Sequence, residues 1–467
     1  MATKLNALDL AFLSLEKQTT PVNVASLTIL QIPENYKGNY ARDLITELEQ
    51  QPPGAPFNQK LSSEHVTSMP SWIEDEQFDI HYHVRHSALP KPGTQEDLLE
   101  LISRMHSRLL DKQRPLWEFY LIEGLEGNRI AMYMKMHHAC IDGMGGVELM
   151  ENCFSLAEQD QVIAPWSGLK KPRQPKVQTE KPSLAESAIN LGKGVSKAGG
   201  LVQDISKLFA NQGLKIVGLK SDEAPVPFTA PKSLFNVPIT GTRRFAVSSM
   251  DLDEIKAVGK QAGATVNDMI LAMCSGALRQ YMQDRQKLPD KPLIATVPVS
   301  VRQLHRTGNQ ITYVMANLAT DEGDSLKRLA KIGESTKSAK EEVQEVAVEA
   351  ATGFAVIAQG FTAALNQLNI TGFVPPPANV TISNVPGPTQ PLYFGRAKLT
   401  AMYPLSVLID GQSLNITVVS YCDTISFGFM ACRDILPDVD VLADYVDEAF
   451  ESIKRRLALN ELIGNPL

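Results

Sequence analysis

The chain has 467 residues, of which 43% are hydrophobic and 21% charged, and its net charge is −7. This length exceeds what one hydrophobic core ordinarily supports and predicts two domains. The acidic balance excludes a general nucleic-acid binder, because binding to phosphate backbones requires a strongly basic face. The five cysteines are odd in number and lack paired spacing, and the first residues lack the layout of a signal peptide, so we expect a cytoplasmic protein without a disulfide scaffold.

The first expected domain, residues 1–160, alternates helical and extended patterns. Its expected elements are a helix over 5–15, a strand over 22–32, a helix beginning after Thr94, and strands over 117–122 and 129–136. Thr94 and Asp97 resemble a capping box for a helix with one apolar stripe, formed by Leu98, Ile102, Met105 and Leu109. The last two strands predict a hairpin that leads into His137 and His138.

Residues 161–234 are expected to form a linker, which is rich in proline and lysine at its start. Its later part, 183–219, carries many lysines and one apolar helical face, formed by Leu201, Ile205, Leu208 and Phe209. A basic amphipathic helix of this kind either lies on an anionic membrane surface or packs its apolar face on the protein between the domains.

Residues 235–467 predict a second α/β domain. Its expected elements are a helix over 265–282, strands over 293–299 and 380–385, an antiparallel meander over 405–409, 413–421 and 424–432, and a closing helix over 442–453. The stretch 350–395 contains no charged residue or histidine. Polar amides and a proline run interrupt it, whereas a membrane-spanning helix needs about 20 mainly apolar residues, so we expect a buried segment.

His137 and His138 are followed by Asp142 and Gly143, where the extended pattern gives way to a helical one. An unperturbed imidazole titrates near neutral pH, which suits it to remove a proton from an alcohol. Histidines at a strand end are also common as structural residues or as zinc ligands. However, adjacent residues of an extended chain point to opposite faces, and the usual zinc spacings His-Glu-x-x-His and Cys-x-x-Cys are absent.

Several short motifs occur in the order seen in a known family. They are Leu8-Asp9 with Phe12, Pro115-Leu116-Trp117-Glu118, the run from His137 to Gly143, Asn267-Asp268, Pro298-Val299-Ser300-Val301-Arg302, Gly308-Asn309 and Ser383-Asn384-Val385-Pro386-Gly387-Pro388. Over nearly its full length the chain therefore resembles the bacterial wax ester synthase/diacylglycerol acyltransferases, which belong to the HHxxxDG acyltransferases. The resemblance implies an α/β (α+β) fold of two chloramphenicol-acetyltransferase-like domains, each a mixed sheet flanked by helices, with an active-site tunnel between them.

The resemblance assigns His138 as the general base and favours catalysis over a metal site or a purely structural pair. His137 is then a structural neighbour of the base. Asp142 is implied to shape the loop through an arginine, for which Arg302 is the candidate, and it also suits a helix N-cap. Gly143 is expected to permit the turn that a side chain would block.

The Asn-Asp motif of the second domain is implied to lie near the active site. Asn267 is the candidate donor to the oxyanion, at a helix N-terminus that favours negative charge. Asp268 also matches an ordinary capping box with Thr265. A rigid strand-turn beside the tunnel, or a purely structural tight turn, is expected from Ser383, Asn384, Pro386 and Gly387.

Two other groups of residues invite rival chemistry. Cys140 could form an acyl-enzyme, but we expect direct transfer because the thiol need not meet the histidine in an irregular loop. His81 and His83, with His86 nearby, would share a strand face in an extended segment. Since no acidic or cysteine cluster accompanies them, we expect a structural role or a position near the CoA rather than a metal site.

The implied activity is an O-acyltransferase that moves a long-chain acyl group from acyl-CoA to a fatty alcohol and to diacylglycerol. Acyl-CoA is then a substrate, and neither a cofactor nor a metal is expected. The long-chain apolar substrates and the basic segment 183–219 predict peripheral contact with the inner membrane or with lipid inclusions. Two alternatives stay open: a related acyltransferase or condensation enzyme that uses acyl-CoA or a carrier-protein thioester, and a lipid-surface binding protein with an inactive site.

Overall fold

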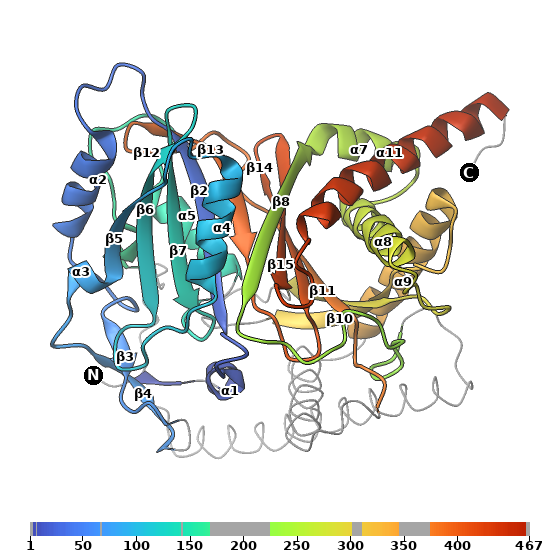
Figure 1. Ribbon diagram of the computed structural model, residues 1–467, viewed down its shortest axis with the longest axis horizontal. Coiled ribbons are helices and arrows are strands. Elements are labelled where there is room, and N and C mark those ends of the chain that lie inside the picture. The colour runs from blue at the N-terminus through green and yellow to red at the C-terminus, as the bar shows by residue number, and fades with distance from the viewer. Residues whose placement is uncertain are drawn as a thin grey trace, which may run out of the picture.

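The computed structural model describes residues 3–5, 7–65, 68–141, 143–168, 225–300, 311–344 and 374–463. In these residues the chain forms two halves that lie side by side (Figure 1). Each half is built on a six-stranded mixed sheet with helices packed against it. The expected architecture of two mixed sheets flanked by helices is therefore confirmed.

The first sheet has the strand order β12-β13-β2-β7-β6-β5. Its strands are β12 (Tyr393–Phe394), β13 (Ala397–Leu405), β2 (Asn23–Gln31), β7 (Arg129–His137), β6 (Trp117–Leu125) and β5 (Val84–Ala88). Only the β5–β6 pair is parallel among these pairs. β12 and β13 come from the range expected to form the second domain, so late residues of the chain complete the first sheet.

The second sheet has the strand order β10-β9-β11-β14-β15-β8. Its strands are β10 (Ile311–Asn317), β9 (Ile294–Ser300), β11 (Val380–Val385), β14 (Leu414–Tyr421), β15 (Thr424–Cys432) and β8 (Arg243–Asp251). β11 runs parallel to both β9 and β14, whereas the other pairs are antiparallel.

The helices cover the faces of both sheets. In the first half they are α1 (Ala7–Leu15), α2 (Tyr40–Glu49), α3 (Ile80–His83), α4 (Gln95–His106), α5 (Gly143–Cys153) and the 3₁₀ turn η2 (Pro165–Ser167). In the second half they are α7 (Leu252–Gln261), α8 (Val266–Asp284), α9 (Ser325–Gln344) and α11 (Asp440–Ile463). A small sheet joins β1 (Thr3–Lys4), β4 (Ser71–Glu74) and β3 (Gln59–Leu61). Within the described part of the chain, no helix combines the length and apolar character that a bilayer span requires.

Local sequence explains where the principal helices begin. At α4, Thr94 Oγ1 accepts the Asp97 N–H at 3.1 Å, while Asp97 Oδ2 accepts the Thr94 N–H at 2.9 Å. This confirms the expected capping box, which satisfies two N–H groups that have no partner inside the helix. The helix ends at His106, so Leu109 lies beyond it and the expected stripe was one residue too long.

The hydrophobic cores follow from the alternation of side chains along the strands. One core fills the second half between its sheet and α8, α9 and α11. A second core lies under α2 and α5 on one face of the first sheet. A third core, on the other face, contains residues of α4 and β7 together with residues of β8 and β15, so the two halves share it.

The backbones of the two sheets approach each other where β13 passes β15. A Cβ atom on Gly428 of β15 would lie 2.2 Å from the carbonyl oxygen of Pro404 in β13. Only glycine permits this approach of two backbones. The expected strand over 405–409 is accordingly wrong: β13 ends at Leu405, and the chain leaves the first sheet there, so the meander is reduced to the β14–β15 hairpin.

Candidate functional site

The two adjacent histidines lie at the end of β7, an inner strand of the first sheet. His137 is its last residue and His138 the next. The His137 N–H donates to Leu116 O and the His138 N–H donates to Val22 O, each at 3.0 Å. Leu116 directly precedes β6 and Val22 directly precedes β2, so the neighbouring strands on both sides hold the backbone of the pair.

The His137 ring is enclosed by protein. Its exposed fraction is 0%, and its Nδ1 accepts the Ala139 N–H at 3.0 Å. The proton of the neutral ring therefore resides on Nε2, which lies 3.4 Å from Oε1 of Glu16. With both nitrogens facing protein groups and no path to solvent, this imidazole is suited to hold the loop rather than to meet a substrate.

Glu16 is a buried partner that the sequence analysis missed. Its side chain is 2% exposed, and its Oε2 lies 3.0 Å from Nζ of Lys112. Burial raises the pKa of the Glu16 carboxyl, but the His137 ring and the Lys112 ammonium together outweigh burial and leave that pKa below its ordinary value. Glu16 is far from His137 and Lys112 in the sequence. The one local indication of such a contact is that an acidic residue directly follows the apolar helix α1.

His138 is partly exposed, unlike its neighbour, although Nδ1 of its ring is buried. It stacks on the ring of Phe12, with centroids 4.1 Å apart and planes inclined by 21°. Phe12 belongs to α1, so the motif near the start of the chain contacts the histidine motif directly. This imidazole is held against an aromatic surface in a residue that is partly exposed, which is compatible with the role of a general base.

Cys140 lies in the same loop but is poorly suited to act as a nucleophile. It packs against a small apolar cluster that includes Leu13, Leu116 and Ala139. Burial, together with the nearby carboxylate of Asp9, raises the pKa of the Cys140 thiol. A thiol must ionise to attack a thioester, so this environment favours the inert form.

The rest of the histidine motif is described only in part. Gly143 begins α5, which places the motif between the end of a strand and the start of a helix, as its sequence pattern indicated. Asp142 and its candidate partner Arg302 lie outside the described residues. The expected pairing of these two residues therefore stays a prediction.

Asn267 and Asp268 lie in the first turn of α8, in the second half. Thr265 Oγ1 accepts the Asp268 N–H at 3.2 Å, and Asp268 Oδ2 accepts the Thr265 N–H at 3.1 Å, so the capping interpretation of Asp268 is confirmed. Thr336 Oγ1 also donates to Asp268 Oδ1 at 2.8 Å. Asn267 is half-buried beside this cap, at the electropositive end of a long helix.

The expected strand-turn is formed by β11 and the residues after it. Ser383 and Asn384 pair with β14, beyond the two residues, Val380 and Thr381, through which β11 pairs with β9. After Pro386, a Cβ atom on Gly387 would lie 2.1 Å from the carbonyl oxygen of Ser420. This turn is therefore a tight backbone approach, which supports its structural interpretation.

His81, His83 and His86 do not form a common site. His81 and His83 belong to the short helix α3, so the expectation that they share a strand face was wrong. His83 is buried, its ring stacks on Trp117 with centroids 4.5 Å apart, and its Nδ1 lies 2.8 Å from Trp117 O. His81 and His86 each approach a different glutamate. Nowhere in the described ranges do three or more His, Cys, Asp or Glu side chains gather as a metal ion would require.

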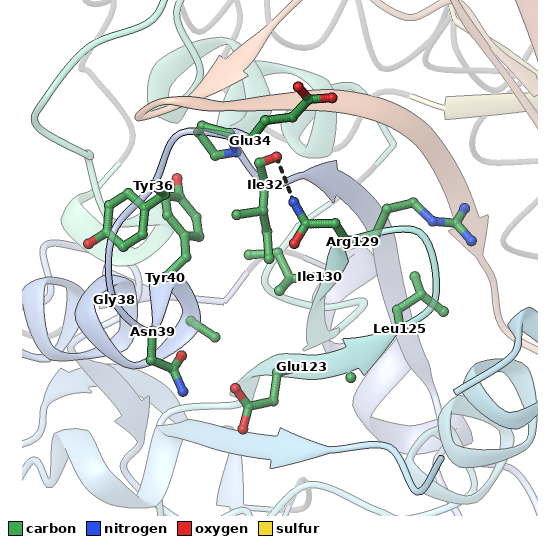
Figure 2. A pocket seen from close by; sticks show the side chains of 14 residues that line it. Ile32, Glu34, Tyr36, Gly38, Asn39, Tyr40, Glu123, Leu125, Arg129 and Ile130 are labelled. Atoms are coloured by element: carbon green, nitrogen blue, oxygen red, sulfur yellow. Dashed lines mark hydrogen bonds between the residues drawn. The ribbon is translucent and has the colours of Figure 1, made fainter. Parts of the chain in front are cut away.

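A surface hollow of about 390 Å³ lies at the opposite end of β7 (Figure 2). Tyr36, Glu123 and Arg129 line it, and Asn128 Nδ2 donates to Ile32 O at 3.2 Å across one side. Since β7 runs from this hollow to the histidines, with a rise of roughly 3.4 Å for each residue, the hollow is remote from the histidine loop. It is not part of the candidate active site.

Two family models match the chain. The model of the wax ester synthase/diacylglycerol acyltransferase catalytic domain matches residues 5–270. The model of the WS/DGAT C-terminal domain matches residues 307–454. The first match contains both histidines and Asn267, and the second contains the strand-turn.

Individual relatives agree with the family models. The O-acyltransferase WSD of Acinetobacter baylyi is 38% identical, over 98% of this chain and 98% of its own length. The solved structure of the wax ester synthase/diacylglycerol acyltransferase from Marinobacter aquaeolei VT8 is 33% identical with a TM-score of 0.76, covering 98% of this chain and 100% of that one. Trichothecene 15-O-acetyltransferase of Fusarium sporotrichioides shares the fold, with a TM-score of 0.57 at 13% identity over 97% of this chain and 95% of that one.

Proposed function

Since the chain belongs to the wax ester synthase/diacylglycerol acyltransferase family, we propose that His138 is the general base of its acyl transfer. The enzyme is an O-acyltransferase, whose substrates are acyl-CoA and an acceptor with a hydroxyl group. The observation that carries the proposal is the contrast between the two rings: His137 is enclosed with both nitrogens facing protein groups, whereas His138 is partly exposed.

The step requires one proton transfer and one exchange of bonds. His138 takes the proton of the acceptor hydroxyl as the oxygen attacks the thioester carbonyl of acyl-CoA. The tetrahedral intermediate then breaks its C–S bond, and the imidazolium returns the proton to the departing CoA thiolate. General-base assistance of this kind contributes roughly 10²–10⁴ in rate.

The oxyanion of that intermediate needs a donor. Asn267 is our candidate, because its side-chain amide lies in the first turn of α8, where the helix dipole also favours negative charge. Removing one such donor from an acyl-transfer site typically lowers kcat by roughly 10²–10³. Asn267→Ala should therefore reduce kcat, and retained activity in that variant would remove the assignment.

We assign long-chain fatty alcohols and diacylglycerol as the acceptors. The names of the matched family and of its solved member include both activities, and they support this choice. Long-chain acceptors partition into lipid, so the assignment includes peripheral contact with a membrane or a lipid inclusion. Flotation with anionic vesicles tests the contact, and an enzyme that stays in the dense fraction contradicts it.

The experiment for the reaction measures thiol release from palmitoyl-CoA with hexadecanol, with diacylglycerol and without an acceptor. Direct transfer predicts release only when an acceptor is present. A burst of thiol without acceptor would indicate an acyl-enzyme and would contradict the assignment of His138 as base to the hydroxyl. The absence of release with either acceptor would contradict the assigned substrates.

A further inference from the structure

The carboxylate of Glu16 lies directly behind the histidine loop. It is 2% exposed, and it follows α1 without a break. Its Oε1 lies 3.4 Å from Nε2 of His137 and accepts the Val22 N–H at 3.4 Å. Its Oε2 lies 3.0 Å from Nζ of Lys112. One side chain therefore contacts three separate segments of the first half.

Two of the groups that contact Glu16, Val22 and the His137 ring, also hydrogen-bond to the backbone of His138 or of the residue after it. Val22, whose N–H is held by Glu16, accepts the His138 N–H through its own carbonyl at 3.0 Å. The His137 ring, whose Nε2 faces Glu16, accepts the N–H of Ala139 on its other nitrogen. The backbone of His138 is thus held on both sides by groups that Glu16 fixes.

A third connection passes through α1. Phe12, which stacks on the His138 ring, lies on this helix one turn before Glu16. Anchoring Glu16 by Lys112 and by Val22 holds the C-terminal end of α1, and with it the aromatic surface against which the imidazole rests. A buried carboxylate is unfavourable unless it is paired and hydrogen-bonded, and here its partners supply both.

We propose that Glu16 is a positioning residue for His138, acting through the ring of His137 and the backbone of Val22. Its role is to accept the Val22 N–H at Oε1 and to face Nε2 of His137 with the same oxygen, so that the His138 ring faces the acceptor hydroxyl in one fixed direction. The negative charge is secondary and serves to hold Lys112. The inference rests on the proposed role of His138 as general base.

Two substitutions whose side chains are close to glutamate in size distinguish the loss of the hydrogen-bond acceptor from a loss of packing. Glu16→Gln keeps an oxygen at Oε1, and we expect its kcat within about fivefold of the wild type. Glu16→Met fills the same space without an acceptor, and we expect its kcat to fall about 100-fold, as for a reacting group displaced by about 1 Å. KM for palmitoyl-CoA and for hexadecanol should be unchanged in both, because the base whose position is disturbed assists only in the transition state.

Asp75 supplies the matched control. It is another buried carboxylate, which accepts from Nζ of Lys60 at 2.8 Å and from the Gln77 N–H at 3.2 Å, and neither group belongs to the histidine loop. Asp75→Leu should lower the midpoint of thermal unfolding, as Glu16→Met does. Its kcat per folded enzyme should stay at the wild-type value. The substitution leaves Lys60 without its carboxylate partner and so lowers stability, but it does not displace His138.

The proposal is supported if Glu16→Met loses at least tenfold more kcat than Glu16→Gln, each counted per folded enzyme, and a smaller separation overturns it. If Glu16→Met does not fold, ¹⁵N NMR of the histidine side chains of the wild-type protein decides. The geometry requires the His137 proton on Nε2, and a proton on Nδ1 overturns the proposal. His138→Ala is measured beside these variants: if it retains activity, the base assignment fails, whereas loss there with an unaffected Glu16→Met refutes only the role of Glu16.

Discussion

Ser103 of α4 accepts a hydrogen bond at its Oγ from the backbone N–H of Phe245, at 2.9 Å. Phe245 lies in β8, the strand at the edge of the second sheet, and one turn later Ser107 accepts the N–H of Arg243 at 2.9 Å. A helix of the first half therefore satisfies the free N–H groups of an edge strand of the second half. This contact helps to fix the relative position of the two sheets.

Replacing both serines by alanine should weaken this junction. Each substitution leaves a backbone N–H of β8 without its acceptor, which costs about 1–3 kcal/mol for a buried group. We expect Ser103→Ala with Ser107→Ala to lower the free energy of unfolding by about 2–6 kcal/mol, measured by urea titration. Thr46→Ala is the control. Ser103 Oγ and Thr46 Oγ1 each donate to the carbonyl four residues earlier in their helix, but Thr46 lies on an exposed face. Equal stability of the double variant and the control would contradict the prediction.

A second prediction about stability follows from the close approach of β13 and β15. A methyl group at residue 428 would lie 2.2 Å from Pro404 O and 3.1 Å from a ring carbon of Phe245. Because the first contact is with backbone, the strands must separate to admit it. We expect Gly428→Ala to lower the free energy of unfolding by about 3 kcal/mol or to prevent folding. Thermal unfolding measures the effect.

Gly333 provides the control for Gly428, because it is a glycine without a close neighbour. It lies within α9, and a Cβ atom there would have no neighbour within 4 Å. Alanine favours a helix over glycine by about 0.5–1 kcal/mol, so Gly333→Ala should raise the unfolding midpoint. If the two glycine substitutions changed stability by the same amount and in the same direction, the close approach at Gly428 would not be the cause.

His83 should make stability depend on pH. Burial between aromatic rings, as the largest influence, lowers its pKa from 6.5 to about 4. The unfolded chain therefore binds this proton at higher pH than the folded protein does. The stability that His83 contributes is present above pH 6.5 and is lost as the pH falls towards 4, by up to about 3 kcal/mol.

His83→Phe tests that prediction because it keeps an aromatic ring but cannot be protonated. We expect the free energy of unfolding of the wild type to fall more steeply between pH 6.5 and 4 than that of the variant. His81→Phe, at a side chain that is 73% exposed, should leave the wild-type slope unchanged. Parallel curves for the wild type and His83→Phe would show that burial of this imidazole does not govern the acid response.

Cys140→Ala distinguishes direct transfer from an acyl-enzyme. Since burial and Asp9 raise the pKa of the thiol, we expect the variant to keep kcat within about threefold of the wild type. Intact-mass measurement after incubation with palmitoyl-CoA alone should show no acyl adduct on the wild-type protein. A stable adduct that the variant lacks would reverse the assignment.

Features that depend on neighbouring residues were predictable from the sequence. The two Thr-x-x-Asp capping boxes, at Thr94 and Thr265, were identified because their hydrogen bonds join residues three positions apart. The β6–β7 hairpin followed from alternating apolar residues around a short turn. The same hairpin placed His137 and His138 at a strand end.

Features that depend on distant residues were not predictable. Alternation over 397–405 is compatible with a strand, but it does not say that the strand joins the first sheet beside β2. Similarly, nothing near Glu16 in the chain shows that His137 and Lys112 become its partners. The motif identified both histidines and the resemblance assigned the base to His138, whereas the fold adds that His137 is enclosed and that His138 is partly exposed.

The most direct measurement is the steady-state rate of thiol release from palmitoyl-CoA and hexadecanol by His138→Ala, at constant pH and per folded enzyme. We predict that kcat falls by roughly 10²–10⁴, while the midpoint of thermal unfolding stays near the wild-type value because His138 is partly exposed. A rate within threefold of the wild type would contradict the assignment of His138 as the general base.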